Sequence, residues 1–174
     1  MNAAAELSRY IRDIPDHPVP GVNFKDICPL LQNASALKLA VSSIVEIVKE
    51  MGIDMVAAPD ARGFIFGVPV AMALNCGFIP IRKAGKLPYA TNSLEYDLEY
   101  GTDTLEIHVD AVEKGSRVLL VDDLLATGGT IQACCELLEQ QQAVVASCCF
   151  VVELDFLNAR ERLAPRLVQS VIHY

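Results

Sequence analysis

The chain has 174 residues, of which 52% are hydrophobic and 21% charged, and its formal net charge is −8. This composition predicts one compact domain with a substantial core, and the acidic balance argues against nucleic acid or an anionic membrane as a partner. The sequence has neither an apolar run long enough to span a membrane nor the pattern of a signal peptide at residues 1–12, so we expect a cytoplasmic protein.

The N-terminal segment begins with a stretch, residues 3–12, that permits a short helix. Pro15, Pro18 and Pro20 prevent its continuation, so residues 13–32 are expected to form a structured loop over the core. Phe24, flanked by polar residues, is open to two interpretations: a staple onto the core, which the residues alone favour, or a ring that stacks on a ligand.

The next elements predict a helix, a buried strand and a second helix. Asn33 can cap a helix that ends near Lys49, because apolar residues recur there every three or four positions. Residues 53–58 predict a buried strand, and an apolar helix follows to about residue 74. Arg62 lies at the turn between them, and an arginine with small neighbours beside a helix N-terminus favours a phosphate ligand.

A basic cluster of Arg82, Lys83 and Lys86 follows a third predicted strand, residues 77–81. Such a cluster can be solvated surface, but ligands of open parallel sheets bind at the carboxyl ends of strands, which favours an anion site. The polar residues 89–104 predict a mobile flap with few anchors. Residues 105–109 alternate as in a half-exposed strand, with His108 as a surface or edge residue.

Residues 117–130 combine a strand, an acidic pair and a glycine-rich loop. The apolar run 118–121 predicts a strand covered on both faces, which Asp122 and Asp123 are expected to end. The loop 126–130 precedes a predicted helix, so its backbone N–H groups and hydroxyls suit a phosphate. The loop matches no common nucleotide motif. An ordinary capped turn is the alternative, but two carboxylates beside a phosphate indicate a sugar diol or a metal on the same ligand, and hence a phosphorylated sugar.

The C-terminal part predicts a strand over residues 143–152, a short helix over 155–163 with a solvated face at 160–162, and a last strand over 167–172. The alternation of strands and helices predicts an α/β fold with a parallel sheet and helices on both faces. Two adjacent cysteine pairs, at 134–135 and 148–149, suit neither a zinc site nor a disulfide, so we interpret the cysteines as buried reduced thiols.

The run VLLVDDLLATGGT resembles the phosphoribosyl pyrophosphate motif of the type I phosphoribosyltransferases. Segments 60–64, 82–88 and 98–101 (DARGF, RKAGKLP and LEYG) resemble the same family in the same order, and the Leu-Leu-Ala-Thr loop is similar to that of members acting on adenine. The resemblance implies a mostly parallel five-stranded sheet flanked by helices, a flexible flap, a small N-terminal hood over residues 1–33 and a phosphoribosyltransferase core over residues 34–174.

The activity that the resemblance implies is transfer of ribose 5-phosphate from phosphoribosyl pyrophosphate to N9 of adenine, which yields AMP and pyrophosphate in purine salvage. It also implies a homodimer, and Mg²⁺ that arrives on phosphoribosyl pyrophosphate without a direct protein ligand. Two alternatives are a transferase for a 6-oxopurine, for which the loop offers no donor, and a non-catalytic regulator, for which a DNA-binding module would be needed.

The resemblance also implies roles for individual residues. In the phosphate and ribose part, the residues are Asp122 and Asp123 for the ribose diol and Ala126, Thr127, Gly128, Gly129 and Thr130 for the 5-phosphate. The pyrophosphate is assigned to Arg62, Arg82, Lys83 and Lys86, and Arg62 is also expected to assist catalysis.

For the purine, the resemblance implies that adenine lies between Phe24 and Leu124, with backbone groups from Val22 to Lys25 reading its polar edge. Position 25 is arginine in some family members, and lysine cannot reproduce a bidentate contact. Glu99 on the flap is the expected acid or base for the purine proton. The peptide between Asp60 and Ala61 is where the family has an unusual cis bond.

Overall fold

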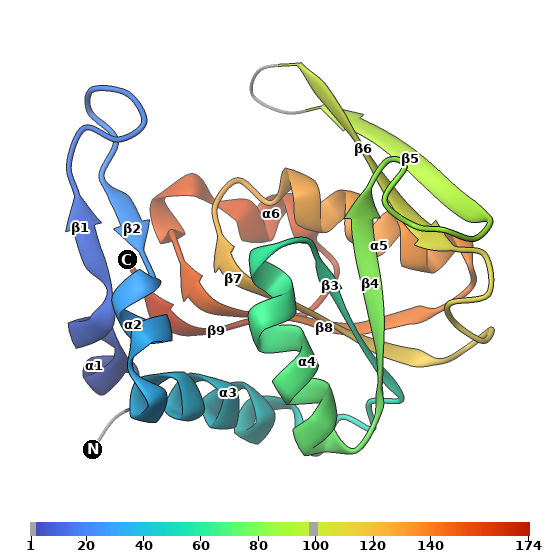
Figure 1. The fold of residues 1–174 in the computed structure, drawn as a ribbon, viewed down its shortest axis with the longest axis horizontal. Coiled ribbons are helices and arrows are strands. Elements are labelled where there is room, and N and C mark those ends of the chain that lie inside the picture. The colour runs from blue at the N-terminus through green and yellow to red at the C-terminus, as the bar shows by residue number, and fades with distance from the viewer. Residues whose placement is uncertain (1–2, 98–100) are drawn as a thin grey trace.

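A seven-stranded sheet forms the centre of the molecule (Figure 1). The structure is a computed structural model, and it describes residues 3–97 and 101–174. The strands are β3 (Met55–Pro59), β4 (Gly77–Lys83), β5 (Thr91–Asp97), β6 (Thr102–His108), β7 (Arg117–Leu125), β8 (Val144–Glu153) and β9 (Val168–His173). Their order is β5-β6-β4-β3-β7-β8-β9. The five strands from β4 to β9 in this order are parallel, as predicted, and β6 and β5 extend the sheet in antiparallel fashion.

Helices cover both faces of the parallel strands. Helices α3 (Ala34–Val48) and α4 (Arg62–Leu74) pack on one face, and α5 (Gly129–Gln140) and α6 (Ala159–Leu163) on the other. The side chains of β7 alternate between the two hydrophobic clusters, with Val118 and Leu120 in the α5 cluster and Leu119 and Val121 in the α3 and α4 cluster. This two-sided burial explains why β7 has a continuous apolar run.

The acidic pair does not end β7, contrary to the prediction. Pairing with β8 continues beyond it, because Asp122 lies opposite Phe150 and Leu124 opposite Val152. Leu125 is fully buried and keeps the strand attached to the core. Asp122 and Asp123 therefore lie within a strand whose pairing with β8 continues past them, which fixes their backbone.

The N-terminal segment contains an unpredicted hairpin. It consists of α1 (Ala3–Leu7), a 3₁₀ turn (Ser8–Tyr10), β1 (Arg12–Ile14), β2 (Phe24–Asp26) and α2 (Cys28–Gln32). We call the described part, residues 3–33, the hood. Its anchors Leu7, Ile27 and Leu30 lie in the same hydrophobic cluster as α3 and α4. The proline-rich residues 15–22 connect the strands of the hairpin, and Asn33 caps α3 as expected by accepting a hydrogen bond from Ala36 N at 3.0 Å.

The predicted flap is more ordered than its composition suggests. Residues 91–97 form β5, which pairs along its whole length with β6, and Leu94 and Tyr96 pack against the α5 cluster. The expectation of few anchors is therefore wrong for this part of the segment. The hairpin projects from the sheet edge at the upper right of Figure 1.

The C-terminal part confirms two interpretations. Residues 160–162 are exposed, as predicted, and the guanidinium of Arg160 also donates to both carboxylate oxygens of the buried Glu153 at 2.7 and 2.8 Å. All six cysteines are free thiols, and the two adjacent pairs are buried as expected, whereas Cys28 is exposed. Among the described residues, no helix is both long and apolar enough to cross a membrane.

The packing of α4 on the sheet depends on Gly67. A Cβ atom there would lie 2.7 Å from Phe78 Cε2 and 2.9 Å from Ala58 Cβ. Helix propensity favours alanine over glycine by about 1 kcal/mol, but Ala58 Cβ is fixed to a buried strand, so the clash dominates. We expect Gly67→Ala to lower the free energy of unfolding by about 1–3 kcal/mol in urea titrations. Ala73→Ser on the exposed side of the same helix should change it by less than about 0.5 kcal/mol, and equal effects would contradict the packing argument.

Candidate active site

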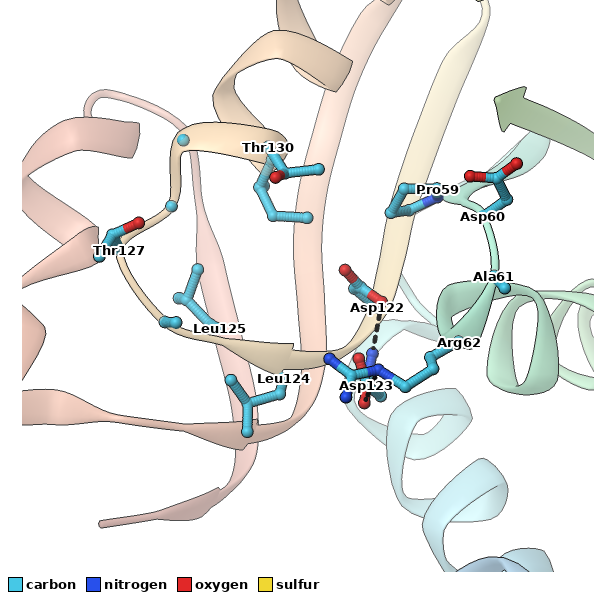
Figure 2. A pocket seen from close by; sticks show the side chains of 14 residues that line it. Pro59, Asp60, Ala61, Arg62, Asp122, Asp123, Leu124, Leu125, Thr127 and Thr130 are labelled. Carbon is cyan, nitrogen blue, oxygen red and sulfur yellow. Dashed lines mark hydrogen bonds and ion pairs between the residues drawn. The ribbon is translucent and has the colours of Figure 1, made fainter. Parts of the chain in front are cut away.

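A cavity of about 300 Å³ lies at the carboxyl ends of β3 and β7, where Figure 2 shows its side chains. Residues 59–62, from the end of β3 into α4, and residues 122–131, from the end of β7 into α5, line it. Strands β3 and β7 are parallel neighbours, with Met55 opposite Val118. Both turns therefore leave the sheet at the same edge and face one another, which is where ligands of open α/β sheets bind.

The loop before α5 is built to receive an anion. Gly128 is the N-cap residue of α5 with φ +82°, a left-handed conformation that favours glycine, and no side chain caps the helix. The N–H groups of the first turn thus lack a side-chain acceptor, and the positive end of the helix dipole lies beside them. Thr127 and Thr130 add two hydroxyls at the cavity (Figure 2), and the cradle suits a phosphate.

The acidic pair lies opposite this loop, next to Arg62. Arg62 Nε is 3.0 Å from Asp123 Oδ2, and Asp123 is almost fully buried. This oxygen has the ion pair but accepts no hydrogen bond of good geometry within the described residues. A buried carboxylate oxygen without a hydrogen bond is costly, so it is suited to accept one from a ligand hydroxyl.

Asp122 is held close to the start of α4. Its Oδ1 accepts a hydrogen bond from Asp123 N at 2.8 Å and lies 3.0 Å from the position that a Cβ would take on Gly63. Gly63 therefore allows the helix to begin directly against the carboxylate. Burial raises the pKa of Asp122 well above its usual range, and the charge of Asp123 raises it further.

The predicted cations divide between the cavity and its surroundings. Arg62 lines the cavity. Arg82 approaches it through Asp60, a lining residue, with 3.2 Å between Arg82 Nε and Asp60 Oδ2. Lys83 and Lys86 lie outside the lining, and the ammonium of Lys83 is 2.9 Å from Asp103 Oδ2 in the antiparallel hairpin. The peptide bond between Asp60 and Ala61 is cis.

The residues predicted to contact adenine lie on β7 and on the hood. Leu124 lines the cavity, whereas Val22, Phe24 and Lys25 lie on the hood outside its lining. Phe24 is half-buried, packs edge-to-face on His17 with 5.2 Å between ring centroids, and belongs to neither hydrophobic cluster of the described residues. It does not act as a core staple. Glu99 lies outside the described residues.

The sequence reasoning missed Tyr96. Its hydroxyl lies 3.4 Å from Thr130 Oγ1 and so connects β5 to the first turn of α5. The alternation of Leu94 and Tyr96 with polar residues was the available signal, but the polar composition of the segment masked it.

The fold and the site together indicate the class of protein to which the chain belongs. A helix N-terminus without a side-chain cap, a buried acidic pair and an arginine at one edge of a parallel sheet suit a phosphorylated sugar with a second anionic group. The model of the phosphoribosyl transferase domain family matches residues 30–167, and the chain belongs to this family.

Its relatives are more specific. The chain is 53% identical to adenine phosphoribosyltransferase of Pseudothermotoga lettingae over 97% of this chain and 99% of that protein. It is 55% identical to the protein of the same name from Nitrosococcus oceani over 97% and 98%. The solved adenine phosphoribosyltransferase of Thermoanaerobacter pseudethanolicus superposes with a TM-score of 0.95 at 48% identity, covering 98% of this chain and 99% of that one. The Saccharomyces cerevisiae enzyme has a TM-score of 0.91 at 38% identity, covering 97% and 98%.

The raised pKa of Asp122 predicts a gain in stability from removing its charge. When the folded-state pKa of a carboxyl is raised, stability is greatest below the unfolded-state pKa and falls as pH rises through the folded-state value. Asp122→Asn should therefore unfold at higher urea concentration than the wild type at pH 7, and the difference should shrink toward about pH 4. Asp110→Asn, at an exposed site, is the control. A variant less stable than the wild type at pH 7 would contradict the account.

Proposed function

We propose that this protein is an adenine phosphoribosyltransferase, which converts adenine and phosphoribosyl pyrophosphate into AMP and pyrophosphate in purine salvage. The observation that carries the proposal is the cavity in which the uncapped N-terminus of α5 faces Asp122, Asp123 and Arg62. The names of the relatives support the choice of purine. The yeast structure is described as a complex with adenine and an imino-altritol bisphosphate.

In this proposal the cavity holds the ribose 5-phosphate between its two walls. The N–H groups and hydroxyls of residues 126–130 bind the 5-phosphate, and the ribose hydroxyls donate to Asp122 and Asp123. The oxygen of Asp123 that lacks a hydrogen bond gains one in this way. These contacts present C1 of the ribose toward Arg62 and the turn after β3.

The leaving pyrophosphate gains negative charge as its bond to C1 breaks. A cation that meets this charge lowers the barrier, because the interaction is stronger in the transition state than in the bound substrate. Arg62 is the cation in the cavity lining, and Arg82 lies behind Asp60. Lys83 and Lys86 are proposed to reach the pyrophosphate from the end of β4 and the turn after it.

The N-terminal segment of residues 1–33, whose described part is the hood, is proposed to form the purine side of the site over the core of residues 34–174. Adenine stacks between Phe24 and Leu124, and backbone groups of Val22 and Lys25 read its edge. Glu99 acts as the acid or base for the purine proton when the hairpin of β5 and β6 closes over the site and excludes water.

Mg²⁺ fits the charge balance of the cavity. The lining residues that the structure describes include three carboxylates, Asp60, Asp122 and Asp123, and one guanidinium, Arg62. A polyanionic substrate alone would face a net negative wall, so we propose that Mg²⁺ enters on the oxygen atoms of phosphoribosyl pyrophosphate, the ligand type that it prefers. Once bound, it would supply positive charge to the leaving group.

A homodimer and a cytoplasmic location complete the proposal. Helix α4 exposes Ile65, Val68 and Met72 along one side, a stripe at helical spacing that a second copy could cover. Light scattering measures the mass in solution, and cell fractionation tests the location.

The proposal is tested by incubating the purified protein with phosphoribosyl pyrophosphate, Mg²⁺ and, separately, adenine, hypoxanthine or guanine. We expect nucleotide mainly from adenine, and activity should disappear when EDTA removes the divalent cation and return with added Mg²⁺. A preference for hypoxanthine or guanine would overturn the assignment. Binding of phosphoribosyl pyrophosphate without turnover of any base would indicate a non-catalytic protein.

Two variants separate proton transfer from substrate binding. Glu99→Ala should lower kcat by roughly 10²- to 10⁴-fold with substrate affinity largely kept, because it removes only the proton-handling group. Arg62→Ala should weaken binding of phosphoribosyl pyrophosphate more than binding of adenine, because Arg62 lines the phosphate cavity. Steady-state kinetics and binding titrations check both. An unchanged kcat in the first variant, or equal loss of both substrates in the second, would remove that residue from its role.

A further inference from the structure

We propose that Tyr174 is a positioning residue for the purine. Its ring holds the ammonium of Lys25, and through Lys25 it fixes the hairpin of β1 and β2, which carries Phe24. Figure 1 shows the C-terminal end of the chain beside β2. The inference rests on the proposed function. It assigns to the Lys25 side chain a positioning role, in addition to the proposed contact of its backbone with adenine.

The side chain of Lys25 is enclosed between two partners. Its Nζ lies 3.9 Å from the centroid of the Tyr174 ring and 2.5 Å from Asp13 Oδ1. Only 10% of the Lys25 side chain is exposed, against 61% of the Asp13 side chain. A cation is strongly attracted to an aromatic face when water is largely excluded from it, and a mostly buried ammonium needs an anionic partner.

This arrangement commits the ammonium of Lys25 to the protein. The same hydrogen bond from Lys25 lowers the pKa of Asp13, so the carboxylate stays ionised. Asp13 and Lys25 are also direct partners in the pairing of β1 with β2. The lysine at position 25 therefore needs no bidentate geometry, because a point charge between a carboxylate and a ring serves the purpose.

The ring of Tyr174 has a fixed position because its backbone extends the central sheet. Tyr174 N donates to Glu153 O at 3.0 Å, and Tyr174 O accepts from Asp155 N at 2.9 Å. Glu153 is in turn held by Arg160 through two hydrogen bonds. The contact between the Tyr174 ring and Lys25 thus attaches the hood to the end of β8 and β9.

The pairing of β7 with β8 connects Tyr174 to the other side of the proposed purine site. Leu124, the cavity side of the proposed purine site, is paired opposite Val152 in β8, next to Glu153. Phe24, the hood side, is adjacent to Lys25 in β2. The contacts from Tyr174 to Lys25 therefore join the two sides of the purine site through the sheet, whereas residues 59–62 and 122–131 form the phosphate cavity without Tyr174 or Lys25.

The test compares the full-length wild type with Tyr174→Leu and Tyr174→Phe. Tyr174→Leu should raise the KM for adenine roughly 3- to 10-fold and change the KM for phosphoribosyl pyrophosphate by less than about 2-fold. Tyr174→Phe keeps the aromatic face and should restore the wild-type KM for adenine. Amide hydrogen exchange of residues 12–26 should be faster in Tyr174→Leu than in Tyr174→Phe.

Asp13→Ala removes the other partner of Lys25 at an exposed position and should raise the KM for adenine in the same selective way. Equal changes in both KM values, an unchanged KM for adenine, or failure of Tyr174→Phe to restore it would each overturn the inference. If Tyr174→Leu does not fold, Asp13→Ala and Tyr174→Phe decide by the same criteria. A wild type that does not use adenine would instead overturn the proposed function, so the two failures are distinguishable.

Discussion

The parallel pairing of β3 with β7 is the constraint on which the rest of the structure depends. It places the turn with Arg62 and the loop before α5 at one edge of the sheet, although about sixty residues separate them in the chain. The pairing requires that both faces be covered, and the alternating side chains of β7 meet this condition by packing on α4 and α5. Gly63 and Gly67 let α4 approach the strands closely enough to bring Arg62 to the acidic pair. The cavity between these two segments is therefore a direct result of core packing.

The buried acidic pair of the site lowers the stability of the folded protein. Asp122 and Asp123 carry adjacent carboxylates on a paired strand, and burial with a neighbouring negative charge disfavours the ionised form of Asp122. The strand cannot rotate them away, because the pairing with β8 continues beyond both residues. A ligand with paired hydroxyls would supply the hydrogen bonds that the protein does not. The destabilisation is then part of what makes the cavity receptive to a sugar.

The sequence predicted the elements whose signal is local. The apolar run of β7, the loop after it, the capped helix α3 and Arg62 at a turn all follow from periodicity, capping and glycine placement, and the structure has them. The features that were missed depend on strand pairing and tertiary contacts, which local periodicity and composition do not show. The hairpin of the hood needs β1 to meet β2 across a proline-rich connection, and β5 is held by β6 and by the packing of Tyr96 near Thr130. Arg160 is exposed as predicted, but its ion pair with Glu153 was missed, because Glu153 is buried only after β8 and β9 pair. Tyr174 had no recognisable signal, because a terminal aromatic residue acquires its partner only from the folded hood.

The ion pair between Arg62 and Asp123 has a further consequence for how charge enters the cavity. The guanidinium already has an anionic partner before any ligand arrives. A phosphate group that binds Arg62 would therefore replace the carboxylate of Asp123 as the anionic partner of the guanidinium. The free energy of such an exchange is a difference between two similar contacts, so under the proposed function Arg62 would contribute to selectivity among anions more than to total affinity. A simple monoanion offers Arg62 little advantage over the carboxylate already present, whereas a doubly charged group with a diol nearby satisfies the cation and the released carboxylate together.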